Sequence, residues 1–217
     1  MIFLMAKKLT PEEDILRVSK MRELEDEKHA AGFKYIAGVD EAGRGPLAGP
    51  VYAAAVILPE NTYIEGINDS KKLSAAKREK LYDEIIEKAA AYHISAVDEE
   101  VIDEINILNA TFEAMKNAVS QLTPSADYVL IDGNRMPPDM PIPGETVVKG
   151  DSKSISIAAA SILAKVSRDR YISEQDKLYP GYGFAKHKGY GTKQHIEAIK
   201  QLGPCKIHRK TFIKNFI

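Results

Sequence analysis

The chain has no tryptophan, a single cysteine and no long apolar run. Because Cys205 stands alone, an intrachain disulfide and a cysteine metal cluster are both excluded. No segment approaches the roughly 20 apolar residues that a membrane-spanning helix requires. The apolar start, Met1–Met5, is soon followed by two lysines and is too short for a signal peptide. We therefore expect a cytoplasmic protein without a membrane partner.

Low-complexity tracts are also missing. The chain has 44% hydrophobic and 28% charged residues, a balance that excludes the disordered and fibrous classes. Its 217 residues are enough for one domain with a complete core. We expect residues 1–34 to form a helical extension and residues 35–217 to form the main domain, with no linker that would separate further domains.

The net charge of −1 gives no sign of a polyanionic partner, but the charges are unevenly distributed. From residue 149 to the end the chain has 14 Lys or Arg against 5 Asp or Glu, and the preceding part has 16 against 26. A basic C-terminal third beside an acidic remainder fits a protein that binds a polyanion on one face. Lysines that only solubilise the surface would give the same counts, so charge leaves both interpretations open.

One stretch near the N-terminus combines an apolar strand, two acids and a glycine-rich turn. The run Tyr35–Val39 predicts a short buried strand, and Asp40 and Glu41 follow it. The glycines of Gly43-Arg44-Gly45 permit a turn and let backbone N–H groups approach a phosphate or sugar, while the arginine offers a fork of donors. A tight turn with two solvated acids is the alternative interpretation.

Further apolar runs predict a sheet flanked by helices. Residues 51–58 form an apolar run between two prolines, and the short connection predicts antiparallel pairing with the first strand. Strands are also expected over residues 92–97, 128–131 and 146–148. The remaining pattern predicts helices over residues 10–31, 74–90, 98–105, 108–122, 155–176 and 192–202.

Two of these strands lead, like the first one, into an acid. Asp132 follows residues 128–131, and Asp151 comes shortly after residues 146–148. Acids at the ends of neighbouring strands would converge on one edge of the sheet and repel one another unless cations lie among them. Carboxylates without histidine or cysteine indicate Mg²⁺ or Mn²⁺. Two such ions would place an attacking water and stabilise the leaving oxygen of a phosphodiester.

The loop over residues 179–191 alternates aromatic, glycine and basic residues. Such a loop is suited to stacking on a base or sugar and to neutralising phosphates, although a rigid surface turn would have the same composition. His187, His195 and His208 are scattered along the C-terminal part and have no identifiable partner. We do not expect them to bind a metal.

Six short segments occur in a specific order and spacing: Gly38–Gly45, Asn68–Lys71, Asp132-Gly133, Lys149–Asp151, Ala159–Arg170 and His187–Tyr190. In this combination they resemble the bacterial ribonuclease HII family, a type 2 ribonuclease H. The resemblance extends from about Tyr35 to Phe212.

The resemblance implies an α/β ribonuclease H-like fold, with a central mixed five-stranded sheet flanked by helices and a C-terminal helical segment that binds substrate. It also implies a monomeric endoribonuclease that uses two Mg²⁺ or Mn²⁺ ions. The expected substrates are RNA/DNA hybrids and duplex DNA with a single embedded ribonucleotide, which is cut on its 5′ side to leave a 3′-hydroxyl and a 5′-phosphate. Ribonucleotide excision repair and primer removal are the corresponding roles.

The resemblance further implies roles for particular residues. The family's metal-binding and catalytic acids correspond to Asp40, Glu41, Asp132 and Asp151. The motif that reads the ribose 2′-hydroxyl and adjoining phosphate corresponds to Gly43, Arg44 and Gly45, and the tyrosine that stacks near the RNA-to-DNA junction corresponds to Tyr190. Further candidates for substrate binding are Lys188 and Lys153. Asp169 matches another family acid, but a salt bridge on a helix surface would explain it equally well.

Two alternative functions are a related ribonuclease HIII and, from another class, a hybrid-binding module. A ribonuclease HIII is disfavoured because Asp151 is not a glutamate and because about 34 residues before the first strand are too few for the extra N-terminal domain of that group. A hybrid-binding module without catalysis is disfavoured because clustered carboxylates that face phosphates would weaken binding.

Overall fold

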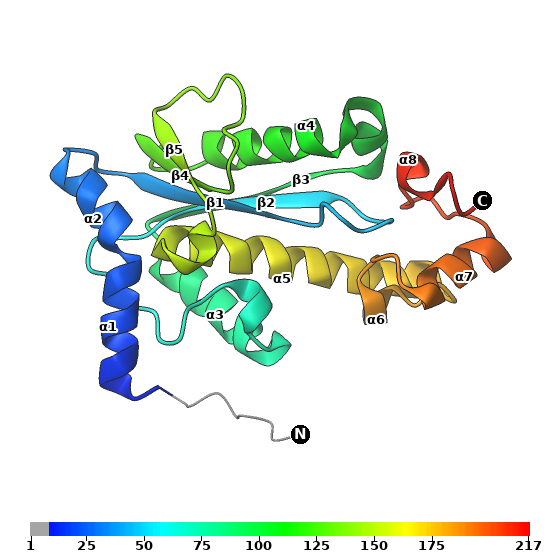
Figure 1. Ribbon diagram of the computed structural model, residues 1–217, viewed down its shortest axis with the longest axis horizontal. Coiled ribbons are helices and arrows are strands. Elements are labelled where there is room, and N and C mark those ends of the chain that lie inside the picture. Colours follow the sequence, from blue (N-terminus) through cyan, green and yellow to red (C-terminus); the bar gives the residue numbers. More distant parts are fainter. Residues whose placement is uncertain (1–8) are drawn as a thin grey trace.

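A five-stranded mixed sheet forms the centre of the computed structural model, which describes residues 9–217 (Figure 1). The strands are β1 (Ile36–Ala42), β2 (Val51–Ile57), β3 (Ala91–Val97), β4 (Tyr128–Asp132) and β5 (Gly144–Val147). The helices are α1 (Pro11–Met21), α2 (Glu23–Ala30), α3 (Ala75–Lys88), α4 (Glu99–Ser120), α5 (Ile155–Leu178), α6 (Phe184–His187), α7 (Lys193–Leu202) and α8 (Lys210–Ile213), with short 3-10 helices η1 (Ser70–Lys72) and η2 (Gly150–Ser152).

The strand order in the sheet is β3-β2-β1-β4-β5. The expected antiparallel pairing of the first two strands is confirmed, and β3 continues this antiparallel half. On the other side of β1, strands β4 and β5 run parallel to it. The expected fold class, a mixed five-stranded sheet flanked by helices, is therefore confirmed.

Helices cover both faces of the sheet. Helix α5 packs across β1 and β2 with α3 beside it, and α4 covers the opposite face (Figure 1). The close approach of α5 to the sheet depends on small residues: a methyl group at Gly38 would lie 2.1 Å from the backbone carbon of Ser156, and Ala158–Ala160 are fully buried. The two faces form separate hydrophobic clusters, and each isolates one side of the sheet from water.

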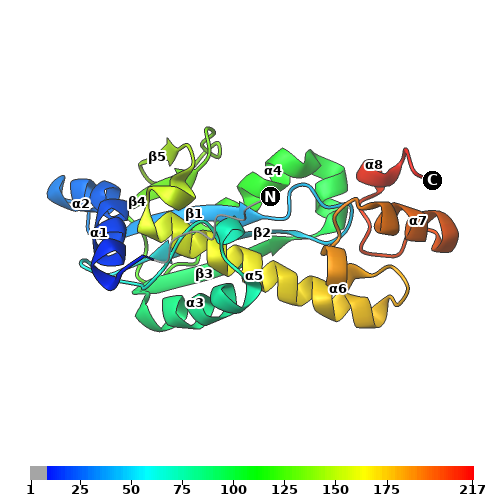
Figure 2. The same cartoon turned by 60° about the horizontal axis from the view of Figure 1, so that its bottom comes forward.

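The N-terminal helices and the C-terminal helices lie at opposite ends of α5 (Figure 2). At the N-terminal end, Val18 and Met21 of α1 are buried in the cluster formed by α3 and α5. At the other end, α6, α7 and α8 share a small hydrophobic cluster with the last turns of α5. The apolar start Met1–Met5 lies outside the described residues. No helix in residues 9–217 has the length and apolar character needed to cross a membrane.

The end of the first strand and the course of the first helix differ from the sequence-based expectation. Strand β1 continues to Ala42, so Asp40 and Glu41 lie within the strand instead of after it. The helix expected over residues 10–31 divides into α1 and α2 at Arg22. The two helices expected on either side of Asn106 are present: they are joined in α4 across a kink at Asn106, which has non-helical backbone angles with a positive φ of 67°.

Candidate metal and nucleic-acid site

The predicted acids of β1 and β4 lie side by side at one edge of the sheet. Strand β4 runs parallel to β1 and ends at Asp132. Alternation along β1 directs Asp40 toward the face covered by α5 and Glu41 toward the face covered by α4. Glu41 accordingly shares a cavity with Met115 of α4 and with Asp132. Asp132, at the strand end, lies near both acids of β1, and its charge contributes to the raised pKa of each.

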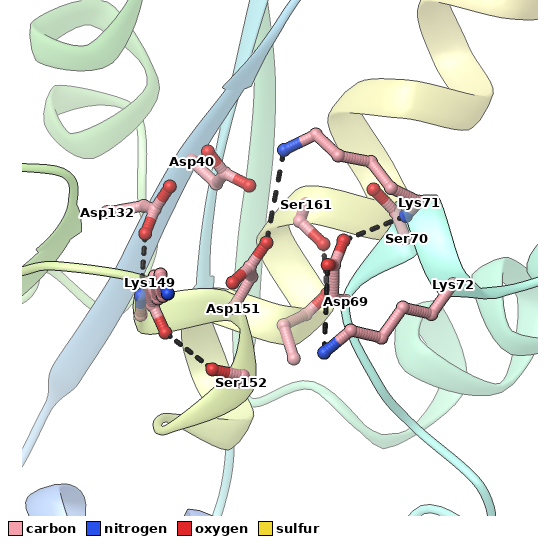
Figure 3. A network of polar contacts seen from close by, with 12 residues as sticks. Asp40, Asp69, Ser70, Lys71, Lys72, Asp132, Lys149, Asp151, Ser152 and Ser161 are labelled. Carbon is pink, nitrogen blue, oxygen red and sulfur yellow. Dashed lines mark hydrogen bonds and ion pairs between the residues drawn. The ribbon is translucent and has the colours of Figure 1, made fainter.

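Asp132 also connects the sheet to the fourth predicted acid. Its Oδ1 accepts a hydrogen bond of 2.7 Å from the backbone N–H of Gly150, at the start of η2. This bond places Asp151, the next residue, at the same edge of the sheet. In Figure 3, Asp40, Asp132 and Asp151 gather around a common space. The four predicted acids therefore lie at one edge of the sheet, with Glu41 on the face covered by α4.

Burial and mutual repulsion dominate the electrostatics of this cluster. Burial raises the pKa of Asp40 well above its usual value, and the charges of Glu41 and Asp132 raise it further. Burial likewise raises the pKa of Glu41. For Asp151, burial raises the pKa, and nearby Asp69 and Asp132 add to the effect. A bound cation would relieve the repulsion among these carboxylates.

Two residues around η1 belong to this neighbourhood although the site prediction did not include them. Lys71 Nζ lies 4.0 Å from Asp151 Oδ2 (Figure 3). Burial opposes its charge, but the carboxylates of Asp40 and Asp151 attract it and raise the pKa of Lys71 overall. Asp69 accepts a bond of 2.8 Å from the backbone N–H of Lys71. Asn68–Lys71 is one of the six segments on which the family resemblance rests. Its position beside the sheet edge, however, becomes apparent only in the folded chain.

The donor set of the acid cluster fits a hard divalent cation. The four predicted ligands offer carboxylate oxygens, which Mg²⁺ and Mn²⁺ prefer. Among residues 9–217, no three His, Cys, Asp or Glu side chains are placed so that together they could hold a metal ion, so the carboxylates share this edge of the sheet without forming a completed ligand set. An open set of oxygen ligands suits Mg²⁺, because this ion keeps several waters and is usually held by a few carboxylates together with substrate phosphates.

The predicted substrate-binding residues form a surface beside the acids. Arg44 Nη1 lies 3.4 Å from Glu41 Oε1, and both residues line a cavity of about 430 Å³ together with Asp132. A methyl group at Gly45 would lie 3.8 Å from Cε1 of Tyr190, so the tyrosine ring lies against this glycine. Tyr190 is 44% exposed, so its ring is accessible to a stacking partner. The turn and the tyrosine therefore form one continuous surface.

The loop over residues 179–191 is less exposed than its composition predicts. It contains the short helix α6, and Tyr182 and Phe184 are 7% and 0% exposed. Their rings stack on each other with centroids 5.3 Å apart inside the C-terminal cluster. The expectation that the aromatic residues of this loop face nucleic acid is wrong for these two, because they form the core on which the C-terminal helices pack.

The three scattered histidines meet in the folded chain. The rings of His187 and His195 stack with centroids 4.4 Å apart, and His195 Nε2 lies 3.1 Å from His208 Nε2. The other ring nitrogen of His195 lies 3.0 Å from the carbonyl oxygen of Tyr190. The cluster therefore supports the Tyr190 segment from inside. Its members lie far apart in the sequence, so pattern analysis could not pair them.

Three other residues singled out from the sequence have their contacts outside the acid cluster. Lys188 donates a bond of 2.5 Å to Ser173 Oγ, so its ammonium group is directed at α5. Lys153 is exposed and lines a cavity of about 660 Å³ between the N-terminal helices and the segment after β5. Asp169 Oδ1 lies 2.7 Å from Lys165 Nζ, one helical turn earlier, and forms an ion pair along α5.

Comparisons with known proteins point to one family. The family model described as Ribonuclease HII matches residues 37–215. The ribonuclease HII of Ruminiclostridium cellulolyticum is 61% identical over 201 residues, which are 93% of this chain and 78% of the relative. The crystal structure of the ribonuclease H2 from Pyrococcus horikoshii OT3 has a TM-score of 0.70 and 29% identity, and covers 84% of this chain and 97% of that chain.

A solved ribonuclease HIII is more distant. The crystal structure of Bst-RNase HIII in complex with Mn²⁺ has a TM-score of 0.62 and 16% identity, and covers 83% of this chain and 64% of that chain. At this identity the likeness concerns the fold alone. The matched family region, by contrast, includes β1, β4 and all four acids at the sheet edge. The resemblance stated from the sequence is confirmed, and the chain belongs to the ribonuclease HII family.

Proposed function

We propose that this endoribonuclease cuts the RNA strand of RNA/DNA hybrids and also cuts duplex DNA on the 5′ side of a single embedded ribonucleotide. Each cut leaves a 3′-hydroxyl and a 5′-phosphate. Family membership supports the enzyme class. The observation that carries the proposal is the convergence of four carboxylates beside a turn that exposes Arg44. Ribonucleotide excision repair and primer removal in the cytoplasm are the corresponding roles.

Asp40, Glu41, Asp132 and Asp151 are the residues that would hold Mg²⁺ or Mn²⁺. When bound, two such ions would supply activation of a water and stabilisation of the leaving oxygen of the phosphodiester. The carboxylates act as ligands in this proposal, and Lys71 beside Asp151 adds positive charge where a phosphate would approach. Burial and, after it, the mutual repulsion of the acids raise the pKa values of Asp40 and Asp151, and this electrostatic cost supports cation binding. Binding of Mn²⁺ by Bst-RNase HIII is consistent with this choice of ions.

Substrate selection is assigned to the turn after β1 and to Tyr190. The 2′-hydroxyl is what distinguishes a ribonucleotide from a deoxyribonucleotide at a given position. The exposed Gly45 has no side chain that would keep a sugar away from the backbone, Gly43 permits the turn, and Arg44 can bind the adjoining phosphate. The exposed ring of Tyr190 lies against Gly45 and can stack at the RNA-to-DNA junction. Because one chain supplies all these groups, we infer that a monomer is active.

A duplex with one ribonucleotide tests the proposal directly. The purified protein is incubated with this duplex, with an RNA/DNA hybrid and with an all-DNA duplex of the same sequence, each with Mg²⁺, Mn²⁺ or EDTA. We expect a single cut 5′ of the ribonucleotide with either metal and no product with EDTA or with all-DNA. Binding of the first two duplexes without cleavage would favour a hybrid-binding module instead.

A further inference from the structure

Two arginine side chains are completely buried beneath the surface that carries Arg44 and Tyr190. Arg168 lies in α5 and Arg209 immediately precedes α8, and each is 0% exposed. Within residues 9–217, neither forms an ion pair with an acidic side chain, and their hydrogen bonds go to backbone carbonyl oxygens. A buried guanidinium without a carboxylate partner is costly, so these positions require another explanation.

Arg209 holds the turn between β1 and β2. Its Nη2 donates to the carbonyl oxygens of Gly43 and Gly49, both at 2.6 Å, and its Nη1 donates to those of Arg44 at 3.0 Å and Pro46 at 2.9 Å. Its Nε donates a further bond of 2.9 Å to Gly49. The five N–H groups of the guanidinium are therefore engaged by one segment. A lysine, with three donors around a single nitrogen, cannot form this set of bonds.

The directions of these carbonyl groups determine where the neighbouring amides point. In a planar trans peptide, the C=O of one residue and the N–H of the next point in opposite directions. Because the carbonyls of Gly43 and Arg44 point inward to Arg209, the N–H groups of Arg44 and Gly45 point away from it. Both residues are exposed. Successive N–H groups with a common outward direction can bind an anion or a hydroxyl oxygen.

Arg168 connects this turn to the segment of Tyr190. Its Nε donates to the carbonyl oxygen of Pro50 at 3.2 Å and its Nη2 to that of Ala48 at 3.0 Å. Its Nη1 donates to the carbonyl oxygen of Lys188 at 3.0 Å, and the guanidinium carbon lies 6.0 Å from the centroid of the Tyr190 ring. One side chain thereby fixes the relative positions of the turn and the tyrosine.

Gly43 and Arg168 fit each other closely. A methyl group at Gly43 would lie 2.1 Å from Arg168 Nε, a contact far inside van der Waals distance. Gly43 also has a φ of +99°, which is strained for residues with a side chain. The absence of a side chain at Gly43 therefore makes room for the buried arginine.

Keeping the guanidinium groups of Arg168 and Arg209 charged inside the protein has an electrostatic cost. Burial lowers the pKa of Arg209 to about 9, and repulsion from Arg168 contributes, while Glu99 partly opposes the effect. Apolar side chains of similar volume often replace buried charges without loss of stability. The hydrogen-bond pattern that arginine alone provides therefore accounts for these residues better than packing does.

We propose that Arg209 and Arg168 are positioning residues for substrate selection. Arg209 holds the turn so that the N–H groups of Arg44 and Gly45 meet the ribose and phosphate of the embedded ribonucleotide, and Arg168 keeps Tyr190 in place beside them. Neither side chain touches the substrate. The inference rests on the proposed function, and it assigns the preference for a ribonucleotide over a deoxyribonucleotide to two residues buried behind the binding surface.

The test compares binding of two duplexes that differ in one 2′-hydroxyl. Dissociation constants of the wild-type protein and of Arg209→Lys are measured in EDTA for a duplex with one ribonucleotide and for the all-DNA duplex. We expect the ratio of the dissociation constant for all-DNA to that for the ribonucleotide duplex to be about tenfold smaller in Arg209→Lys than in the wild type, which is the scale of one misplaced hydrogen bond. The affinity of the variant for all-DNA should stay close to wild type. With Mg²⁺, kcat for the single ribonucleotide should fall more than KM changes.

Arg168→Lys is the second variant and should show the same loss of preference. Arg170→Lys is the matched control, because Arg170 lies in the same helix and pairs with Glu79 at the surface. An equal loss of affinity for both duplexes would indicate a general fold defect and would overturn the proposal. Unfolding of both Arg209→Lys and Arg168→Lys at the assay temperature would also overturn it. Cleavage by the wild-type protein is measured first. If it cuts neither the hybrid nor the duplex with an embedded ribonucleotide, the proposed function itself is overturned.

Discussion

The carboxylate of Glu25 in α2 accepts a hydrogen bond of 2.5 Å from the hydroxyl of Ser154, the residue that caps the N-terminus of α5. The same oxygen accepts a bond of 3.0 Å from the backbone N–H of Ser156. Glu25 is buried, and its second carboxylate oxygen has no hydrogen-bond partner within residues 9–217. Because Asp151 lies three residues before Ser154, the N-terminal helices are joined directly to the segment that carries one of the predicted metal ligands.

This contact predicts a pH dependence of stability. Burial raises the pKa of Glu25 above its ordinary value of 4.5. The folded state therefore binds the proton more tightly than the unfolded state, and this contribution to stability is complete below pH 4.5 and is lost as pH rises through the raised value. We expect the unfolding free energy of Glu25→Gln to decline less steeply above pH 4.5 than that of the wild type, as measured by urea unfolding in EDTA.

The exposed Glu23 lies in the same helix, and Glu23→Gln provides the control. Equal slopes for wild type and Glu25→Gln between pH 4.5 and neutrality would contradict the assignment.

Local patterns in the sequence were sufficient for most of the elements. Thr10 caps the N-terminus of α1 with its side chain, and Pro11 occupies the first turn. Apolar runs located the strands, and the acids near the ends of β1 and β4 converge as expected. These features depend on residues close together in the chain, which is why propensity, capping and alternation could predict them.

The contacts of Glu25, Arg168 and Arg209 could not be predicted in this way. The bond from Ser154 to Glu25 spans 129 residues, and the bond from Arg209 to Gly43 spans 166. A charged residue in a helix or near the C-terminus is ordinarily solvent-exposed, so its burial becomes apparent only once the chain has folded back.

Asp132→Asn should remove cleavage without loss of the fold. The amide oxygen of asparagine can still accept the bond from the N–H of Gly150, while the negative charge and one ligand oxygen are lost. We expect kcat on a single-ribonucleotide duplex to fall about 100-fold or more. We also expect Mg²⁺ to raise the thermal midpoint of the wild type more than that of the variant, because a ligand stabilises the state that binds it.

Asp139→Asn is the matched control, since Asp139 is exposed in the loop after β4 and has a positive φ of 57° that asparagine tolerates. Full cleavage by Asp132→Asn would refute its place among the metal ligands.

Tyr190→Ala should weaken cleavage at a single ribonucleotide more than cleavage of a continuous hybrid. The ring lies against Gly45 and is exposed, so its loss removes a stacking surface at the junction, which is present beside an embedded ribonucleotide but not within a hybrid. Loss of stacking is worth about 1–3 kcal/mol per base, or roughly five-fold to more than a hundred-fold in kcat/KM. Tyr190→Phe keeps the ring and should retain most activity. Equal losses on both substrates would remove the junction-reading role.

Because His195 is buried in the histidine cluster, we expect the folded protein to lose stability in mild acid. Burial, together with repulsion from His187 and His208, lowers the pKa of His195 to about 4 from its ordinary value of 6.5. Since the unfolded state binds the proton more readily, the stability contribution is complete above pH 6.5 and is lost as pH falls toward about 4. His195→Gln should flatten the unfolding free energy across this window in urea titrations, whereas His93→Gln on β3, outside the cluster, should leave the profile unchanged. If His195→Gln declines as steeply as the wild type, another group is responsible for the acid sensitivity.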